Sequence, residues 1–363
     1  MLASALPMLQ KWSVAAIFGL ATVAVTAAET GSKERLQTTR LRASRTRVVR
    51  PVTLPASVLP PEPTERDVAV SEACRRGLGG TQGAVVAMDP RSGRVMAIVN
   101  PLHGLLNAYQ PCSVFKIVTG IAGLSEGVIT PETNFPCSKS CWTWPGHGSI
   151  NLKRALAVSC NPFFQQTGEL LGFEKMQKYA QMLGLGAISG INLTGESPGL
   201  FPGFVRPEGM ALLSSHAEGI KTTPVQIAVL LSAAINGGIV YQPQIASAAG
   251  FVPKERWRFP EGTSVNGLAE GFMAAVNEGS ASPAFDPDVV VAGKTGSCSK
   301  VGWFASYAPA DDPEVVIVVF MRWGNGHGAS AIAGRIYQEL YKTTTVSRPV
   351  ITPATADGRP QHP

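Results

Sequence analysis

Short hydrophobic runs bounded by turn residues predict β-strands on either side of the chain's central part. The runs 83–88 and 95–99 flank the turn sequence 89–93, which contains proline, serine and glycine and predicts a hairpin. Later runs predict three further strands, at 289–293, 303–307 and 315–320. Because the turns are short, we expect antiparallel pairing within each group.

The region between the two strand groups is mostly helical in pattern. From about residue 113 to 235 the pattern is interrupted at prolines, and its clearest helix, 228–236, is stopped by two glycines. Outer helices are predicted from 64 to about 77 and from about 330 to 341. These elements imply an α+β fold, an α/β sandwich in which a five-stranded antiparallel sheet is covered by helices, plus an all-helical subdomain.

A cation, hydroxyls and a glycine follow the strand predicted at 289–293. They are Lys294, Thr295, Gly296 and Ser297, and the Lys-Thr-Gly triplet occurs once in the chain. A lysine and hydroxyls suit the binding of a carboxylate, and a glycine lets a substrate backbone come close. This tetrad is therefore a candidate substrate-binding element.

Two serines stand three residues before a lysine. Ser113 and Lys116 lie where a buried helix is predicted to begin, so their side chains share one face. Ser297 and Lys300 follow a strand, where this spacing does not bring side chains together. A serine needs a base to act as a nucleophile, and a lysine serves if burial and neighbouring cations lower its pKa. The alternative is that Ser113 only caps the helix and Lys116 is exposed.

Two Ser-x-Asn patterns are also present. Ser159 and Asn161 follow a predicted helix at 152–158, where a hydroxyl and an amide could relay a proton and orient a substrate. Ser264 and Asn266 form the second pattern. For both, ordinary capping of a helix end is the alternative interpretation.

The six cysteines are too few for a disulfide scaffold in 363 residues. Cys137 and Cys141 lie four positions apart, which permits a local disulfide in an exported protein. With His147 and Cys160 they also offer four ligands of the types that zinc prefers. Free or separately buried thiols are the third interpretation. The predicted chemistry requires no cofactor, so zinc would be structural.

The chain resembles the transpeptidase domain of penicillin-binding proteins, because the serine-lysine, serine-asparagine and lysine-threonine-glycine motifs occur in that family's order. The resemblance covers about residues 65–342. Four longer segments share it, at 83–93, 155–164, 223–238 and 302–309. It implies a fold of the DD-peptidase and β-lactamase-like type, and it favours Ser113 over Ser297 and Ser159 over Ser264.

The resemblance also implies a role for each motif. Ser113 would attack the carbonyl of a D-Ala-D-Ala stem peptide of peptidoglycan and form an acyl-enzyme, while Lys116 takes its proton. Ser159 and Asn161 would assist proton transfer and hold the substrate amide. The tetrad at 294–297 would bind the terminal carboxylate.

Two backbone N–H groups, those of Ser113 and Ser297, would form the oxyanion hole in this scheme. An acceptor amine from a second stem peptide would then take the acyl group and complete a cross-link. β-Lactams would trap Ser113, and other cell-wall synthesis proteins are the expected partners.

The chain departs from the family's pattern in three respects. Cys112 stands where the family usually has a glycine before the nucleophile, and Ser297 stands where threonine is commoner. About 35 residues separate the N-terminal apolar run from the domain, too few for a glycosyltransferase domain or a non-catalytic pedestal. We therefore expect a stand-alone transpeptidase module.

Alternative functions follow from the same motifs. In a DD-carboxypeptidase water would replace the acceptor amine, and a class D-like β-lactamase would use a carboxylated Lys116. Outside the enzymes, a β-lactam sensor or an inactive wall-binding module is the competing interpretation. A sensor is expected to have several membrane spans, and inactive modules tend to lose the serine or a lysine.

An uncharged apolar run at 12–28 predicts export. The predicted order is a membrane anchor or signal peptide, a basic proline-rich linker, the transpeptidase domain and a disordered tail, at 1–28, 29–63, 64–343 and 344–363. We expect the domain in the cell envelope, on the periplasmic side of the inner membrane, anchored by a single N-terminal span or secreted after cleavage.

The basic residues of the linker are the observation that opposes this orientation, by the positive-inside rule. The catalytic interpretation nevertheless needs the domain outside. The net charge of +6 is concentrated in that linker, which favours contact with a membrane or wall polymer. No recognition fold accompanies the charge, so we expect no nucleic-acid partner.

Overall fold

The computed structural model describes residues 54–138, 141–260, 263 and 265–342. The predicted apolar run, most of the predicted linker and the predicted C-terminal tail lie outside these ranges, as does Ser264. Within them, every helix is too short or too polar to cross a membrane.

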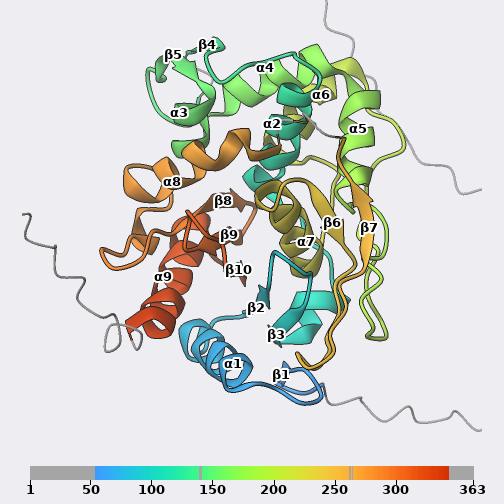
Figure 1. Cartoon of the computed structure of the whole chain (residues 1–363). Helices are drawn as coiled ribbons and strands as arrows, with labels where there is room; N and C mark the ends of the chain where they lie inside the picture. Colours follow the sequence, from blue (N-terminus) through green and yellow to red (C-terminus); the bar gives the residue numbers. More distant parts are fainter. Residues whose placement is uncertain (1–53, 139–140, 261–262, 264, 343–363) are drawn as a thin grey trace, which may run out of the picture. The chain divides into compact units, whose positions relative to one another are not determined.

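One antiparallel sheet of six strands, in the order β1-β3-β2-β10-β9-β8, organises the structure (Figure 1). The strands are β1 (Ser57–Val58), β2 (Gly83–Met88), β3 (Val95–Val99), β8 (Ala292–Cys298), β9 (Val301–Ala308) and β10 (Val315–Arg322). The predicted fold class is confirmed, and the sheet joins strands from both ends of the domain. β1 is an addition at the edge, formed by residues that were predicted to be linker and paired with β3.

The strand predicted at 289–293 is displaced in the structure. β8 begins at Ala292, so the Lys-Thr-Gly-Ser tetrad lies inside the strand, and Lys294 pairs with Ala305 of β9. The preceding valines are used differently: Val289 and Val291 are buried in the apolar cluster beneath the sheet. Their hydrophobic side chains therefore serve packing, and the more polar tetrad makes the strand pairing.

Helices cover both faces of the sheet, because alternate side chains of β10 enter two different apolar clusters. One cluster includes side chains of α1 (Glu65–Leu78), α8 (Ala269–Asn277) and α9 (Gly326–Lys342). The other includes α2 (Lys116–Ser125) and α7 (Pro224–Ile235). Nearly every residue of α7 is buried, as expected for a helix that is apolar all round.

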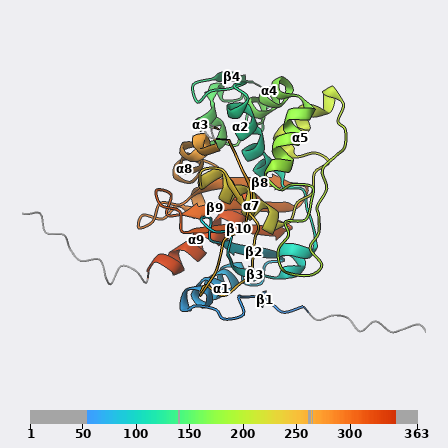
Figure 2. The same ribbon diagram turned by 45° about the vertical axis from the view of Figure 1, so that its right-hand side comes forward.

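A helical subdomain lies at the top of Figures 1 and 2, with α1 and β1 at the opposite end of the view. Beside α2 it contains α3 (Leu152–Ala157), α4 (Asn161–Leu171), α5 (Phe173–Met182) and α6 (Met210–His216). The region is not entirely helical, since β4 (Asn134–Cys137) and β5 (Gly148–Asn151) form a hairpin within it.

A second short hairpin, β6 (Ile239–Tyr241) with β7 (Glu255–Arg258), follows α7. The sequence analysis missed both hairpins, because their strands are three or four residues long and lack an alternating pattern. Short helical turns complete the described elements, at Leu102–Leu106, Cys112–Phe115, Pro207–Gly209, Val265–Leu268 and Ser282–Ala284.

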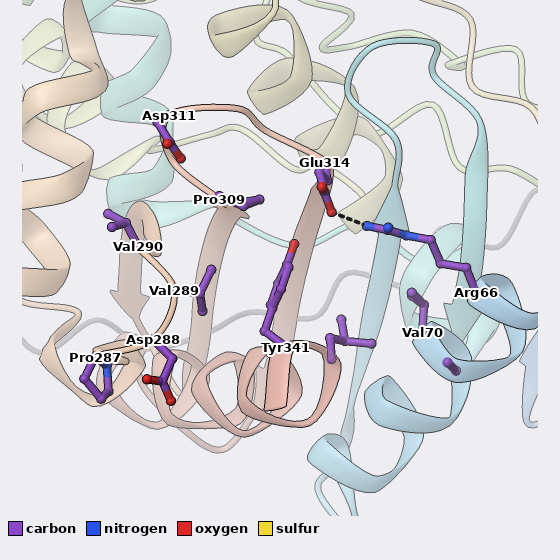
Figure 3. A pocket seen from close by; sticks show the side chains of 12 residues that line it. Arg66, Val70, Pro287, Asp288, Val289, Val290, Pro309, Asp311, Glu314 and Tyr341 are labelled. Atoms are coloured by element: carbon purple, nitrogen blue, oxygen red, sulfur yellow. Dashed lines mark hydrogen bonds and ion pairs between the residues drawn. The ribbon is translucent and has the colours of Figure 1, made fainter. Parts of the chain in front are cut away.

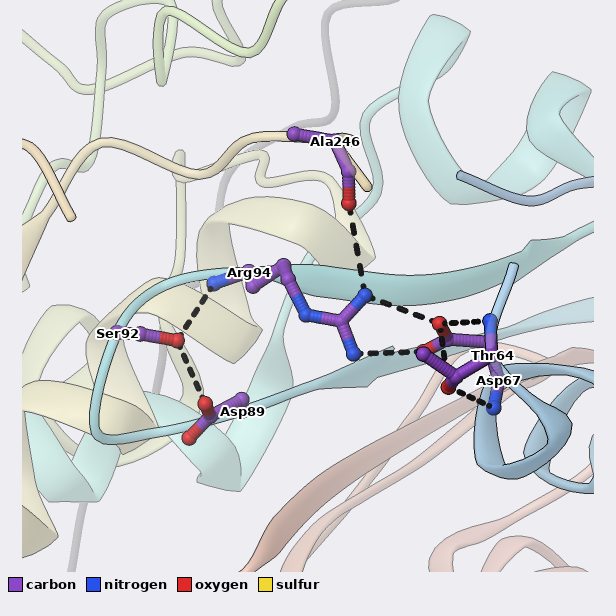
Figure 4. Close-up of polar contacts among 6 residues, drawn as sticks. All are labelled: Thr64, Asp67, Asp89, Ser92, Arg94 and Ala246. Carbon is purple, nitrogen blue, oxygen red and sulfur yellow. Dashed lines mark hydrogen bonds and ion pairs between the residues drawn. The ribbon is translucent and has the colours of Figure 1, made fainter. Parts of the chain in front are cut away.

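A buried ion pair fastens the first helix to the first hairpin (Figure 4). Arg94, at the start of β3, donates from Nη2 to Asp67 Oδ1 at 2.7 Å and from Nη1 to Oδ2 at 3.1 Å. Asp67 also accepts from the backbone and hydroxyl of Thr64, the N-cap of α1. Burial alone would raise the pKa of Asp67, and these hydrogen bonds outweigh it and lower the pKa.

Candidate active site

Ser113 lies in the helical turn Cys112–Phe115, which leads directly into α2. The neighbouring side chains of this turn are buried, whereas Ser113 itself is partly exposed. The predicted buried helix start is confirmed. The alternative of a capping serine with an exposed Lys116 is wrong, because the lysine is fully buried and Ser113 makes no capping bond.

Lys116 is held by the second motif. Its Nζ donates to Asn161 Oδ1 at 2.6 Å, to the Ser159 carbonyl oxygen at 2.8 Å and to Ser159 Oγ at 3.1 Å. Burial lowers the pKa of Lys116 to about 7, and nearby cysteines oppose that effect only in part. In the free protein the amine is thus bound to the second motif and not to Ser113, and it is poised to lose its proton near neutral pH.

The second motif occupies the junction between two helices. α3 ends at Ala157 and α4 begins at Asn161. Ser159 between them has a φ of 54°, a left-handed backbone conformation that residues with a Cβ rarely adopt. This turn directs its carbonyl and its hydroxyl toward the same amine.

Lys294 reaches the same hydroxyl from the sheet. Its Nζ donates to Ser159 Oγ at 2.9 Å and to the Thr295 carbonyl oxygen at 2.9 Å. Burial, and secondarily the charge of Lys116, lower the pKa of Lys294 well below its usual value. The Ser159 hydroxyl therefore lies between two buried amines.

The rest of the tetrad shapes the edge of the sheet next to Ser113. A Cβ on Gly296 would lie 2.7 Å from the Pro111 carbonyl oxygen, so only glycine lets β8 approach the Ser113 turn this closely. Thr295 Oγ1 is 2.7 Å from Ser280 Oγ. Ser297 is exposed, and its hydroxyl accepts a hydrogen bond from the backbone N–H of Gly326.

The competing serine-lysine pair does not form a site. Ser297 Oγ contacts the start of α9, while Lys300 Nζ lies 4.9 Å from the ring centroid of Trp323. The three selected motifs, by contrast, meet around one hydroxyl. The other Ser-x-Asn pattern cannot be compared in the same way, since Ser264 lies outside the described residues.

His216 is a neighbour of the site that the sequence analysis missed. Its Nε2 is 3.3 Å from Asn161 Nδ2, and its Nδ1 is 2.7 Å from Ser215 Oγ. Burial, and then the charge of Lys116, lower the pKa of His216, which favours a neutral ring that accepts from the amide. A single histidine at the end of α6 carries no sequence pattern that could have identified it.

A disulfide between Cys112 and Cys298 was also missed. The sequence did contain an indication of it. Cys112 precedes Ser113 and Cys298 follows Ser297, and the family resemblance implies that the motifs of both serines contact the same substrate. The alternative of a local disulfide between Cys137 and Cys141 is wrong, since both thiols are free.

The predicted cysteine–histidine cluster is assembled. The ligand atoms of Cys137, Cys141, His147 and Cys160 all lie within 4.8 Å of one another. Cys137 Sγ is 3.2 Å from His147 Nδ1 and 3.1 Å from Cys160 Sγ. A tetrahedral zinc ion bound at ~2.3 Å to sulfur and ~2.0 Å to nitrogen would place ligand atoms roughly 3.4–3.8 Å apart. Donor types and spacing therefore fit this metal.

A cavity of about 670 Å³ lies elsewhere, between α1, the end of α9, the segment before β8 and the β9–β10 loop (Figure 3). The ion pair of Arg66 with Glu314, at 2.6 Å, closes one side of it. Its lining includes none of the motif residues. We place the candidate site at the motifs, where the pKa values of the buried groups are shifted, and not at this cavity.

The chain is similar in sequence to known proteins of one family. The sequence profile of the penicillin binding protein transpeptidase domain matches residues 83–342. Stage V sporulation protein D of Bacillus subtilis is 31% identical in an alignment of length 286 that covers 64% of this chain and 44% of that protein. The peptidoglycan D,D-transpeptidase MrdA of Acinetobacter baumannii is 26% identical in an alignment of length 348 that covers 73% of this chain and 51% of that protein.

The fold is also found in solved structures. The complex of a penicillin-binding protein, PBP2, with MreC from Helicobacter pylori matches with a TM-score of 0.69 and 19% identity, over 76% of this chain and 62% of that chain. The chain spans about half the length of the curated relatives that it matches. Since the profile match covers nearly all of the domain that the structure describes, the chain belongs to the penicillin-binding protein transpeptidase family.

Proposed function

We propose that this chain is a peptidoglycan D,D-transpeptidase that forms an acyl-enzyme on Ser113. The observation that carries the proposal is the position of Ser159 Oγ, 3.1 Å from Lys116 Nζ and 2.9 Å from Lys294 Nζ. Two buried amines joined by a hydroxyl, next to a partly exposed serine, supply the base and the proton relay that serine acylation needs.

Acylation begins with the neutral amine of Lys116. It takes the proton of the Ser113 hydroxyl as the oxygen attacks the carbonyl carbon of the penultimate D-Ala. The peptide bond breaks, and the proton returns through the Ser159 hydroxyl to the amine of the departing D-Ala. The stem peptide remains on Ser113 as an ester.

The acceptor amine completes the reaction. It attacks the ester carbonyl and gives its proton to the base. The ester bond to Ser113 breaks, the serine oxygen takes that proton back as a hydroxyl, and a new peptide bond joins the two stems. A β-lactam follows the first half of this path, and its opened ring stays attached to the serine. The same acyl group passed to water would make the chain a carboxypeptidase.

Lys294 and the rest of the tetrad bind the carboxylate of the terminal D-Ala in this proposal. Lys294 is poorly solvated in the free protein, which is why its pKa is lowered. A bound carboxylate is an opposite charge that favours the protonated amine, so substrate binding restores the charge of Lys294. Backbone N–H groups of Ser113 and Ser297 stabilise the oxyanion.

The proposed site of action is the extracytoplasmic side of the cell envelope. The Cys112–Cys298 disulfide supports it, because disulfides persist in oxidising compartments. The solved relative that contains MreC suggests a class of partner, a protein of cell-wall assembly. Nucleic acid has no place in this function.

We further propose that the cysteine–histidine cluster holds a structural zinc ion. Cys160 lies between Ser159 and Asn161, so a metal bound there would fix the backbone of the second motif. Burial raises the pKa of the Cys137 and Cys160 thiols, and a bound cation would reverse that cost by stabilising the thiolates.

Metal analysis of the purified chain tests the zinc proposal. We expect one zinc ion per chain, loss of the ion in His147→Ala and Cys141→Ser, and a lower melting temperature after chelation. Cys74→Ala is the matched control, because Cys74 is a buried free thiol outside the cluster. A Cys141→Ser variant that holds as much zinc as the parent would contradict the proposal.

Covalent labelling with a fluorescent penicillin tests the main proposal. The intact chain should be labelled, Ser113→Ala should not, and Ser299→Ala, an exposed serine in the β8–β9 turn, should behave as the parent. Equal labelling of Ser113→Ala would overturn the nucleophile assignment. Rapid release of the label would favour a β-lactamase.

Stem peptides that end in D-Ala-D-Ala separate the remaining enzymes. With a second stem peptide as acceptor, a transpeptidase gives a cross-linked product that mass spectrometry detects together with released D-Ala. Release of D-Ala without cross-linked product, at all acceptor concentrations, would identify a carboxypeptidase.

A further inference from the structure

A covalent bridge lies against the proposed acylation site, and none of the proposed steps uses it. Cys112 and Cys298 are 186 residues apart in sequence, and their Cα atoms are 5.8 Å apart across the disulfide. Cys112 immediately precedes Ser113, and Cys298 immediately follows Ser297. The bridge therefore joins the two segments whose backbone N–H groups would form the oxyanion hole.

Cys298 lies at the edge of the sheet. Among the strands that the structure describes, β8 pairs with β9 alone. Cys298 is the last residue of β8 and pairs with Val301 across a two-residue turn in which both residues have positive φ. The end of this hairpin is also held by hydrogen bonds from the Gly326 N–H to Ser297 Oγ and from the Trp323 N–H to the Lys300 carbonyl, but these contacts do not lead to the Ser113 turn.

Cys112 occupies a backbone position that does not suit it. Its φ is 54°, in the left-handed region where a Cβ is unfavourable and glycine is preferred. Its side chain is fully buried. A cysteine at this position therefore has a conformational cost that the disulfide offsets.

The other contacts between the two segments are non-covalent. The Trp303 indole donates to the Gln110 carbonyl oxygen at 2.8 Å, and Gly296 packs against Pro111 and Val114. The disulfide is the covalent tie between the segments, and it reaches the end of β8.

We propose that the Cys112–Cys298 disulfide positions the oxyanion hole by fixing the separation of the Ser113 and Ser297 backbone N–H groups. This inference rests on the proposed acylation of Ser113. Oxyanion donors act on the charge that develops in the transition state, so the bridge should affect the chemical step and leave binding of the ground state unchanged.

Pre-steady-state labelling with a fluorescent penicillin tests the proposal, because it separates the dissociation constant of the non-covalent complex from the limiting acylation rate. The variants are Cys298→Ser, Cys112→Gly and the double variant. We expect a roughly 10- to 100-fold lower limiting rate, short of the ~10²- to 10³-fold cost of losing a whole donor. The dissociation constant should not change.

Cys112→Gly separates the bridge from its backbone. Glycine suits the positive φ, so this variant removes the disulfide without straining the turn. If only the conformation of the turn mattered, Cys112→Gly would be acylated at the parental rate, and that result would overturn the proposal. A positioning role predicts that it is as slow as Cys298→Ser.

Reduction of the folded parent protein provides the second measurement, which is independent of whether a variant folds. A phosphine reductant should slow acylation of the parent and of Cys74→Ala, and it should not affect the double variant; unchanged near-ultraviolet circular dichroism shows that the fold is retained. If Ser113 is labelled at the same rate with and without the bridge, this inference is overturned and the proposed function is not. No labelling of the oxidised parent overturns the proposed function, and the inference with it.

Discussion

The structure buries cations in two opposite ways. At the base of α1, the Arg94 guanidinium is almost fully buried and meets both oxygens of a buried carboxylate, that of Asp67. At the candidate site, Lys116 and Lys294 are completely buried, and their hydrogen bonds go to hydroxyl, amide and backbone carbonyl oxygens.

The difference separates a structural cation from a reactive one. A buried charge with a bidentate partner keeps its charge, because the partner replaces water. A buried amine that meets only neutral oxygens is destabilised in its charged form, so its pKa falls into the range useful for proton transfer. Lys116, with a pKa of about 7, belongs to the second class.

Lys116→Met gives the largest expected effect. Without its base, Ser113 should be labelled by penicillin roughly 10²- to 10⁴-fold more slowly. The melting temperature should be unchanged or higher, since an apolar side chain of similar length replaces an amine that lacks a counter-ion. If the variant is labelled at the normal rate, or melts well below the parent, Lys116 is a structural cation like Arg94.

Arg94→Met should show the opposite pattern. Removing one partner of a buried pair leaves the Asp67 carboxylate uncompensated, which should lower the free energy of unfolding by about 3–5 kcal/mol. The labelling rate per folded molecule should stay the same. Denaturant unfolding measures the first quantity, and Arg91→Met is the control, because the exposed Arg91–Asp312 pair should contribute only ~0–1 kcal/mol. Equal destabilisation by both variants would contradict the comparison.

The pH dependence of acylation follows from the lowered pKa of Lys116. The lysine acts when neutral, so the rate should rise with pH and level off above the pKa of about 7. Between pH 6 and pH 8 the rise should be about tenfold, because the neutral fraction grows by that factor. A profile that is still rising steeply at pH 9 would show that burial has not shifted this lysine.

His216→Ala gives the smallest expected effect. The ring touches the Asn161 amide, whose oxygen accepts from Lys116. Losing one such contact should slow acylation by about 2- to 10-fold, in line with a net hydrogen-bond contribution of ~0.5–1.5 kcal/mol. His216→Gln retains a polar group and should recover part of the rate. If both variants acylate at the parental rate, His216 has no positioning role.

Much of the site could be predicted because its residues are consecutive or one helical turn apart. Ser113 with Lys116, Ser159 with Asn161, and the tetrad are local patterns. Helix or strand context distinguished Ser113 from Ser297, and the family resemblance was needed to favour Ser159 over Ser264. The fold class followed from strand runs on both sides of a helical block. These features depend on short-range periodicity, which a sequence displays directly.

The features that were missed depend on distance in space. The Cys112–Cys298 bridge joins positions that only the completed sheet brings together. The contact of His216 with Asn161 arises where α6 packs beside α4. The displaced start of β8 has another cause: strand propensity alone could not tell that Val289 and Val291 pack beneath the sheet.

The central pairing of the sheet, β2 with β10, has a consequence for biogenesis. β2 is among the first strands of the domain to be synthesised and β10 is the last, so the neighbours at the centre of the sheet are separated by almost the whole domain. Non-local pairing of this kind makes folding slow and postpones it until translation of the domain is complete. A truncated or still-growing chain should therefore lack the proposed acylation site, and the proposed reaction with β-lactams should be acquired in one step, when the last strand takes its place.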